Sequence, residues 1–572
     1  MRSESSPLRI KLLAFAFILV SLVILVRLFT WQVVRADQLT RIARSQHQAS
    51  SVIPAQRGTI LSSDGFPLAS SKDAFLVWAS LKDVRDPSLI ASRLAPLFVG
   101  EDNDLVQAEE ERIKKLLSKE NVVWVSIKHK VSTEVKAQII KLDFPGIGFD
   151  VEETRDYPEG SMSAHLLGFV GSDAAGQDRG YFGLEGYYDL TLSGTRGQKD
   201  WEKDAQGTQI LVGLSRNIGV SDGLSLTTHI DRSLQFTVER HLETGLVKYG
   251  AATGTVIIMR PQDGRILAMA SLPSYDPAQF SKFDKESFVN PAVGESFEPG
   301  SVFKPLIMAA ALDANVLEPD TKCTECGGPR RIAEFTIGTW NDKYFPDSTA
   351  TEIIEHSDNV GMVWVGEKLG KEKLYDYLQK FGIGSLTGID LQDETTPALR
   401  QKDSWGLVDV ATTSFGQGIA VTPIQMVRAV AVIANKGRIV TPQVVTEVIG
   451  TNFKEEIKPV VGKQVISEGA AKAMTEMMVN AVETGEAKWT KLAGFRVAGK
   501  TGTAQIPLRG HYDADKTIAS FIGFAPADNP RFVMLVTLRE PKSSPWASET
   551  AAPLWFAIAK DIFPHLGIHP ED

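Results

Sequence analysis

The chain has 572 residues, of which 43% are hydrophobic and 23% are charged, and its formal net charge is −9 at pH 7. This length predicts at least two domains, and the composition is that of a folded globular protein with enough apolar material for a large core. Nucleic-acid binding is not expected, because phosphate recognition needs concentrated Lys and Arg.

The first element is a long apolar run at Leu12 to Val34, which carries a single charge at Arg27. As a helix it reaches roughly 35 Å, enough to cross a hydrocarbon core of about 30 Å. Arg27 can extend to the lipid headgroups, and Trp31 is placed for the interfacial belt. We therefore predict one transmembrane helix at residues 12–34. A cleaved signal peptide is the alternative, but the run is long for one and no small-residue cleavage site follows it.

The charges beside this run do not fix its orientation, because three basic residues precede it and three follow it closely. The short tail at residues 1–11 and the long polar remainder favour a cytoplasmic N-terminus. We therefore expect a single-pass protein of the cell membrane, with most of the chain on the extracytoplasmic side.

After the run, Ala36 to Gln48 has the pattern of a helix, and from Val52 the chain mixes short apolar runs with Gly and Pro turn signals. The pattern to about Gly213 indicates strands and loops with one charged helix at Asn103 to Glu120. We predict an elongated, strand-rich α+β domain at residues 50–215, which we call the pedestal.

A second domain is predicted at residues 222–565. Strand pairs occur at both of its ends, at Gly254–Arg260 with Arg265–Ser271 and at Thr517–Ala525 with Arg531–Leu538. Apolar spacing predicts helices between them and after them, at Ile307–Leu312, Thr351–Leu369, Leu374–Phe381, Pro423–Asn435 and Ala551–Ile562. The fold class is therefore α+β, with an antiparallel sheet built from both ends of the domain and flanked by helices.

The chain has two cysteines, Cys323 and Cys326. A structural zinc site needs four ligands and no second Cys pair completes the set, so we predict no metal site. A disulfide in a short loop and a reduced pair in a turn both stay open as interpretations.

The first candidate catalytic motif is Ser301-x-x-Lys304, which is preceded by Pro299-Gly300 and followed by Pro305. Pro305 is tolerated only near a helix start, so Ser301 is predicted at a helix N-terminus. Lys304, three positions on, then lies on the same face and can take the serine proton if its pKa is depressed by burial and nearby cations. Taken alone, the motif is better explained by a serine N-cap with a solvated lysine.

Two further motifs follow along the chain, Ser357-Asp358-Asn359 and Lys500-Thr501-Gly502-Thr503. Together with S-x-x-K they are the signature of penicillin-binding proteins and class A β-lactamases. The combination is far more specific than any one motif. A second S-x-N, Ser215-Arg216-Asn217, precedes the nucleophile and is attributed to chance.

Each residue of these motifs suits one chemical task. Ser357 can relay a proton to the leaving amine, and Asn359 can hold the acyl side of a substrate. Lys500, after a strand predicted at Phe495–Gly499, can hold a substrate carboxylate, while Gly502 lets a substrate backbone approach the strand edge. Backbone N–H groups of Ser301 and Thr503 can form an oxyanion hole.

Over nearly its whole length the sequence resembles a class B penicillin-binding protein. The family phrases FEPGSxFKP and FGQGIAVTPIQM occur almost letter for letter at Phe297–Pro305 and Phe415–Met426. Matches at Arg57–Ile60 and Gly183–Gly186 extend the resemblance to the pedestal, where we expect a structural role. Ser357–Gly361 looks more like the division and sporulation (FtsI-type) branch than the elongation branch.

The resemblance implies a peptidoglycan D,D-transpeptidase that crosslinks stem peptides, with a D-Ala-D-Ala donor, in septal or other cell-wall synthesis. It further implies acylation by β-lactams, no metal or organic cofactor, and divisome partners that include a membrane glycosyltransferase of the SEDS type. The resemblance implies that Ser301 is the acylated nucleophile and Lys304 the base. It also implies that Ser357 and Asn359 form the family's second motif, and that Lys500, Thr501 and Thr503 form its third.

Other functions stay open beside this one. A class A β-lactamase would carry an E-x-x-L-N motif after Ser357, and a β-lactam sensor would carry more membrane spans; the sequence has neither. A catalytically silent divisome scaffold and an elongation-type transpeptidase are the remaining alternatives.

Overall fold

The structure is a computed structural model that describes residues 7–100, 102–174, 176–204, 210, 215–508 and 511–571. Of the predicted tail at residues 1–11, the first six lie outside the described residues. The chain divides into two compact units, one formed by Met1–Ala55 with Gly194–Asp222 and the other by Gln56–Ser193 with Gly223–Asp572.

The first unit contains the N-terminal helices and a small antiparallel sheet. Helix α1 (Pro7–Phe29) continues as a π-helical turn at Thr30–Val34, and α2 (Ala36–His47) follows. Leu8–Val34 has no buried part and is long and apolar enough to cross a membrane, so the predicted apolar helix is confirmed. The sheet has the order β1-β8-β9, with strands β1 (Gln48–Ile53), β8 (Gly197–Glu202) and β9 (Ser215–Ile218).

The second unit contains a seven-stranded sheet in the order β17-β16-β10-β2-β3-β4, in which β5 also pairs with β3. The β2–β10 pairing is parallel, and the other pairings are antiparallel. Its strands are β2 (Ile60–Leu61), β3 (Pro67–Ser80), β4 (Trp124–Val131), β5 (Ile147–Asp156), β10 (Ser225–Thr228), β16 (Val445–Ile449) and β17 (Lys454–Glu456).

Three helices cover part of this sheet: α3 (Pro87–Val99), α4 (Asn103–Leu117) and α5 (Thr133–Lys141). The expectation of a single charged helix here, which is α4, was therefore wrong. Ile90 and Leu94 of α3 are buried in one core with Val77 and Val125 of the sheet. This burial outweighs Pro96, which lies inside α3 and interrupts its helical sequence pattern.

Short elements follow β5: α6 (Ala164–Leu167), β6 (Phe169–Ser172), β7 (Asp178–Tyr181), α7 (Gly183–Tyr187) and α8 (Asp189–Ser193). Arg57 joins them through ion pairs to Glu185 at 2.7 Å and Asp189 at 2.8 Å, and Arg155 pairs with Glu185 at 2.6 Å. Glu185 is fully buried. Its ion pair with Arg57 joins Arg57–Ile60 to Gly183–Gly186, the two pedestal segments that resemble the family.

A five-stranded sheet in the order β12-β11-β21-β20-β19 has every neighbouring pair antiparallel. Its strands come from both ends of the predicted second domain: β11 (Thr253–Met259), β12 (Ile266–Leu272), β19 (Ala498–Leu508), β20 (His511–Ala525) and β21 (Phe532–Arg539). The predicted antiparallel sheet is thus confirmed, and β19 is one of its two edge strands.

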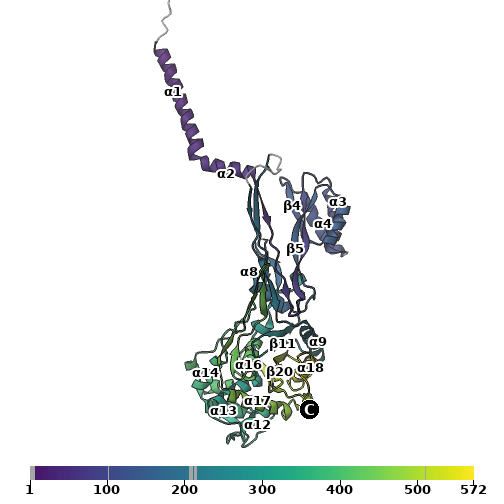
Figure 1. The fold of residues 1–572 in the computed structure, drawn as a ribbon, viewed down its shortest axis with the longest axis vertical. Coiled ribbons are helices and arrows are strands. Elements are labelled where there is room, and N and C mark those ends of the chain that lie inside the picture. Colours follow the sequence, from purple (N-terminus) through teal and green to yellow (C-terminus); the bar gives the residue numbers. More distant parts are fainter. Residues whose placement is uncertain are drawn as a thin grey trace, which may run out of the picture. The chain divides into compact units, whose positions relative to one another are not determined.

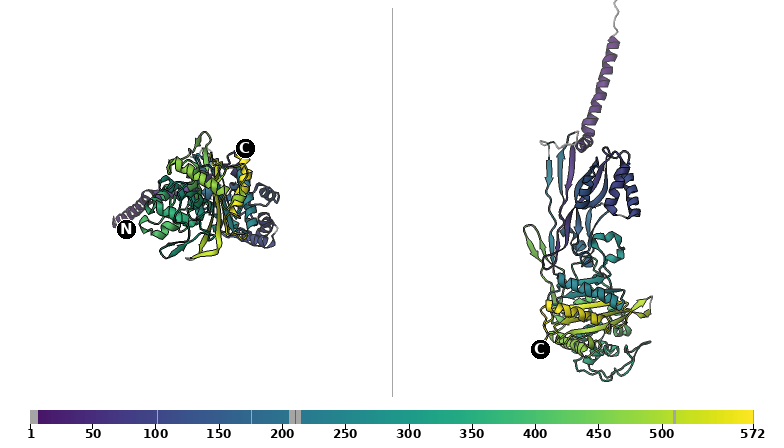
Figure 2. Two further views of the ribbon diagram at one scale, coloured as in Figure 1. Left: turned by 90° about the horizontal axis from the view of Figure 1, so that it is seen from below. Right: turned by 90° about the vertical axis from the view of Figure 1, so that its right-hand side faces the viewer.

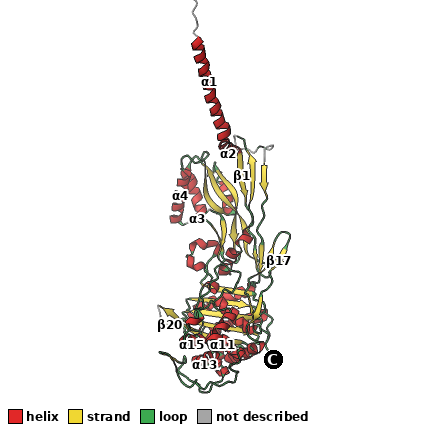
Figure 3. Ribbon diagram, turned by 90° about the vertical axis from the view of Figure 1, so that its left-hand side faces the viewer, coloured by secondary structure: helices red, strands yellow, loops and turns green. Residues whose placement is uncertain are grey.

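Helices cover both faces of this sheet (Figure 3). Val256 and Ile258 of β11 pack in one cluster with Trp555 of α18 (Ala551–His565). Ile257 and Met259 belong instead to the cluster of α11 (Lys304–Asp313) and α16 (Pro423–Ala434). In Figure 1, α18 lies beside α9 (Arg232–Tyr249), and the right-hand view of Figure 2 shows α18 in yellow next to the sheet. Apolar residues at successive positions of β11 are explained by this burial on both sides.

Between β12 and β19 the chain is mainly helical. The helices are α10 (Pro291–Gly294), α11 (Lys304–Asp313), α12 (Ala350–Glu355), α13 (Asn359–Leu369), α14 (Lys371–Lys380), α15 (Leu407–Ser414), α16 (Pro423–Ala434) and α17 (Glu468–Glu483). Short 3-10 turns lie at Pro277–Lys282, Lys285–Phe288, Gly300–Phe303, Lys402–Ser404 and Lys488–Thr490. Two small antiparallel pairs join β13 (Arg330–Ile332) to β14 (Phe335–Ile337) and β15 (Arg438–Val440) to β18 (Val461–Gln464). Cys323 and Cys326 are joined by a disulfide, which decides between the two interpretations left open above.

Two predicted elements differ from the structure. The helix expected over Thr351–Leu369 is broken, because Ser357 has a φ of +54° and Asp358 caps a new helix by accepting a hydrogen bond from Val360 N–H at 2.8 Å. The strand expected at Phe495–Gly499 begins at Ala498 instead, so the K-T-G-T motif lies inside β19 rather than after it.

Candidate active site

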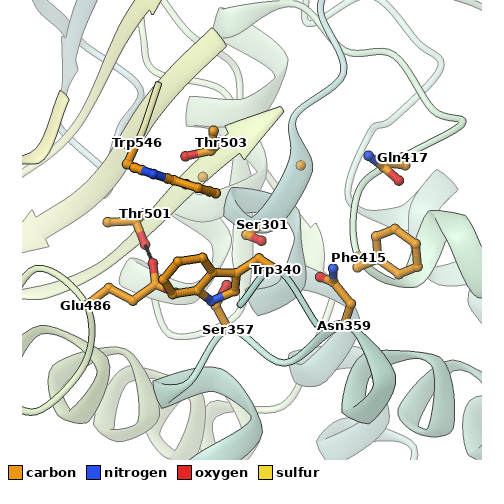
Figure 4. A pocket seen from close by; sticks show the side chains of 12 residues that line it. Ser301, Trp340, Ser357, Asn359, Phe415, Gln417, Glu486, Thr501, Thr503 and Trp546 are labelled. Carbon is orange, nitrogen blue, oxygen red and sulfur yellow. Dashed lines mark hydrogen bonds between the residues drawn. The ribbon is translucent and has the colours of Figure 1, made fainter. Parts of the chain in front are cut away.

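One pocket at the edge of the five-stranded sheet brings the three motifs together (Figure 4). Six of the eight predicted site residues line it: Ser301, Ser357, Asn359, Thr501, Gly502 and Thr503. The other two, Lys304 and Lys500, are 0% and 3% exposed and contact the lining residues from below the surface. The sequence motifs therefore converge, although they come from a helix start, a helix break and an edge strand.

Ser301 lies in the 3-10 turn Gly300–Phe303, which runs directly into α11 at Lys304. Pro299 is the N-cap residue of this turn, Phe303 is that of α11, and neither helix start has a side-chain cap, so the alternative of Ser301 as an N-cap is not supported. Gly300 donates its N–H to the carbonyl of Gly416 at 2.9 Å. A Cβ at Gly416 would lie 2.1 Å from the Gly300 oxygen, so the FGQG segment needs glycine there to hold the nucleophile turn.

Strand β19 packs against this turn. A Cβ at Gly502 would lie 2.8 Å from the backbone nitrogen of Val302, so glycine at this position lets the edge strand approach Ser301. The role predicted for Gly502, close approach of a substrate backbone, stays a prediction. The structure gives the residue a second reason to be glycine.

Lys304 is the centre of a buried hydrogen-bond network. Its Nζ donates to the carbonyl of Ser357 at 2.6 Å, to Ser357 Oγ at 3.2 Å and to Asn359 Oδ1 at 2.8 Å. No hydrogen bond joins Lys304 Nζ to Ser301 Oγ within the described part of the chain. The S-D-N motif thus positions the lysine, and the left-handed conformation of Ser357 turns its carbonyl and hydroxyl toward the same ammonium group.

The electrostatic environment of Lys304 suits a base. Burial, together with the nearby charge of Lys500, lowers the pKa of Lys304 to about 7, although Asp358 and Glu486 oppose this shift. Burial also lowers the pKa of Lys500, and Glu486 opposes that shift as well. A lysine with a pKa near neutrality exists in part as the free amine, which can accept a proton.

The two threonine hydroxyl groups of the third motif differ in their hydrogen bonds. Thr501 Oγ1 donates to Glu486 Oε2 at 3.2 Å and lies 3.3 Å from Lys500 Nζ. Thr503 Oγ1 instead accepts the N–H of Ala547 at 3.0 Å, which leaves its own proton available for a ligand. Of the two threonines, Thr503 is therefore the one whose hydroxyl proton is free to be donated to a ligand.

Sequence reasoning missed several residues of the pocket wall. Phe415 and Gln417 belong to the FGQG phrase, so the family resemblance could have found them. Glu486, Trp340 and Trp546 lie outside every motif, and no local pattern marks them. Glu486 reaches the pocket from the segment after α17, Trp340 from the loop after β14, and Trp546 from the loop before α18.

Two family models match the chain. The Penicillin-binding Protein dimerisation domain matches residues 52–223, and the Penicillin binding protein transpeptidase domain matches residues 254–563.

Individual proteins give the same result. Stage V sporulation protein D of Bacillus subtilis is 35% identical over 97% of this chain and 85% of its own length. The peptidoglycan D,D-transpeptidase FtsI of Escherichia coli is 30% identical over 97% of this chain and 91% of its own. The crystal structure of penicillin-binding protein 3 of Mycobacterium tuberculosis with ampicillin matches with a TM-score of 0.69 and 25% identity, over 91% of this chain and 97% of that chain.

Proposed function

Because this chain belongs to the family of penicillin-binding proteins with a transpeptidase domain, we propose that it crosslinks peptidoglycan through an acyl-enzyme on Ser301. Ser301 attacks the D-Ala-D-Ala bond of one stem peptide, the terminal D-Ala leaves, and an amine of a neighbouring stem resolves the ester into a crosslink. β-Lactams mimic the donor and stay attached to Ser301.

In this mechanism the free amine of Lys304 takes the Ser301 proton, and the Ser357 hydroxyl passes it to the leaving amine. Lys500 and the Thr503 hydroxyl hold the donor carboxylate, and backbone N–H groups of Ser301 and Thr503 bind the oxyanion. Asn359 holds both Lys304 and the acyl side of the donor.

One observation carries it: Lys304 Nζ contacts both Ser357 and Asn359 beneath the pocket in which Ser301 and the K-T-G-T strand meet. A test is to label the full-length protein with a fluorescent penicillin and to locate the modified residue by mass spectrometry. Modification of Ser301 supports the proposal, and a different modified residue contradicts it.

The names of the relatives support the division and sporulation branch, since they include a stage V sporulation protein and FtsI. The apolar segment Leu8–Val34 supports membrane anchoring. We infer a cytoplasmic N-terminus and an extracytoplasmic catalytic domain, with the pedestal at residues 50–215 and the transpeptidase domain at residues 222–565.

Replacement of Lys500 tests the carboxylate-binding role. Lys500→Ala should slow acylation by penicillin by about 10²-fold or more, because a buried cation beside a carboxylate is lost. Lys500→Arg should retain more of the rate, since it keeps the charge but not the geometry. Stopped-flow acylation kinetics measure both rates. Equal rates for the alanine and arginine variants would remove the argument for a cation at this position.

A partner follows from the proposed activity. A protein that crosslinks strands without making them needs a separate polymerase, which we propose is a membrane glycosyltransferase of the SEDS type within the divisome. With lipid II alone, the purified protein should give no glycan polymer. When the polymerase is added, the wild type should give crosslinked polymer. The Ser301→Ala variant with the polymerase should give polymer without crosslinks. Analysis of digested product by mass spectrometry distinguishes these results. Polymer made by this protein alone would contradict the proposal.

A further inference from the structure

A carboxylate lies in the wall of the pocket, although none of the three motifs contains it. Glu486 follows α17 and is half-buried, and its Oε2 accepts the hydrogen bond from Thr501 at 3.2 Å. Among the described residues that line the pocket, Glu486 is the one with a charged side chain. The surface presented to a ligand is therefore locally acidic, while the two lysines lie buried beneath it.

Two indole rings stand beside this carboxylate. Trp340 and Trp546 both line the pocket, with ring centroids 4.9 Å apart, and they are 46% and 38% exposed. In the view of Figure 4, the Trp340 ring overlaps Glu486, and Trp546 is drawn on the side of Thr501 and Thr503, which line the same pocket. The face of an indole ring attracts cations, and most strongly where water is partly excluded.

A carboxylate flanked by aromatic faces recognises a cation, and the donor peptide offers none at its C-terminal end. Glu486 would instead repel the donor carboxylate, which the mechanism proposed above assigns to Lys500 and to the Thr503 hydroxyl. The second substrate of a transpeptidase does bring a cation, because an amine acceptor is protonated in neutral water. The acidic wall therefore fits the acceptor better than the donor.

We infer that Glu486, with Trp340 and Trp546, forms the acceptor subsite and docks the ammonium group of a primary amine on the acceptor stem peptide. This inference rests on the proposed transpeptidase function. It assigns the acceptor to the part of the pocket between Glu486 and the two indole rings.

After docking, Ser357, Lys304 and Ser301 can accept the protons that the acceptor nitrogen loses. One proton of the ammonium passes through the Ser357 hydroxyl to the free amine of Lys304, whose pKa of about 7 allows it to accept. The neutral nitrogen then attacks the ester carbonyl, so that the C–N bond forms and the bond to Ser301 Oγ breaks. The second proton of the nitrogen goes to Ser301 Oγ, and Lys304 releases its proton to solvent.

The test measures how the acyl-enzyme partitions between aminolysis and hydrolysis, which is independent of how fast it forms. The full-length protein in detergent is given a D-alanyl thioester donor with either Nα-acetyl-lysine, whose side-chain amine is an ammonium ion, or hydroxylamine, which is uncharged at neutral pH. Glu486→Gln should lower the aminolysis-to-hydrolysis ratio for Nα-acetyl-lysine by about tenfold and leave the ratio for hydroxylamine within twofold. Glu486→Asp should be intermediate.

The matched control is Glu483→Gln, which removes a carboxylate at the end of the same helix that pairs with Lys491 and does not line the pocket. It should behave as the wild type with both acceptors. An unchanged ratio in Glu486→Gln, or an equal fall for both acceptors, overturns the inference, since an equal fall indicates a merely structural role. Failure of the wild type to form any acyl-enzyme with the thioester would instead count against the proposed function.

Discussion

Replacing Ser301 with alanine is expected to abolish covalent labelling by penicillin while leaving the fold intact. The reason is that, among the described residues, Ser301 is the one with a hydroxyl that both lines the pocket and lies in the turn leading into α11, one turn from Lys304. The Ser301 side chain forms no cap on its helix, so its loss should change the melting temperature by no more than a few degrees, below even the ~1 kcal/mol of a capping serine. Gel fluorescence and thermal unfolding measure the two effects.

A serine in another 3-10 turn is the matched control. Ser404 lies in Lys402–Ser404, outside the pocket, and its hydroxyl donates to the Gln401 carbonyl. Ser404→Ala should label as fast as the wild type. If Ser301→Ala is still labelled, the nucleophile must be a residue other than Ser301.

Removal of Lys304 should slow acylation by about 10² to 10⁴-fold, the range typical for loss of a general base. In the wild type, the base must be the neutral amine. Because the pKa of Lys304 is lowered to about 7, the acylation rate should be constant above that pH and fall about tenfold per unit below it. Second-order acylation rates between pH 5 and 9, measured with a reporter penicillin, test this profile.

The lysine substitution needs its own controls. Lys304→Met keeps the volume of the buried stem and should be as slow as Lys304→Ala, which separates loss of the amine from loss of packing. Lys436→Ala removes an exposed lysine and should leave the profile unchanged. A rate for Lys304→Met near that of the wild type, or a rate of wild type that does not fall below neutral pH, would contradict the assignment of Lys304 as base.

Much of this protein was determined by local sequence. The apolar helix, the strand pairs at Gly254–Ser271 and Thr517–Leu538, and the helix start at Ser301 follow from periodicity, turn residues and a proline, all of which act over a few positions. The three motifs narrowed the candidates to penicillin-binding proteins and class A β-lactamases, and the phrases at Phe297–Pro305 and Phe415–Met426 then indicated the class B penicillin-binding proteins.

Only the tertiary structure decided how the site is assembled. Ser357 breaks a segment with a continuous helical pattern, because its carbonyl and its hydroxyl accept hydrogen bonds from Lys304, a residue distant in the sequence. The Gly502 position is crowded by Val302, a neighbour that no local pattern names. Glu486, Trp340 and Trp546 come from loops whose sequences carry no periodicity, so only the packing of the elements around them places their side chains in the pocket. Local propensity determines which elements form, whereas contacts between distant segments determine which side chains meet.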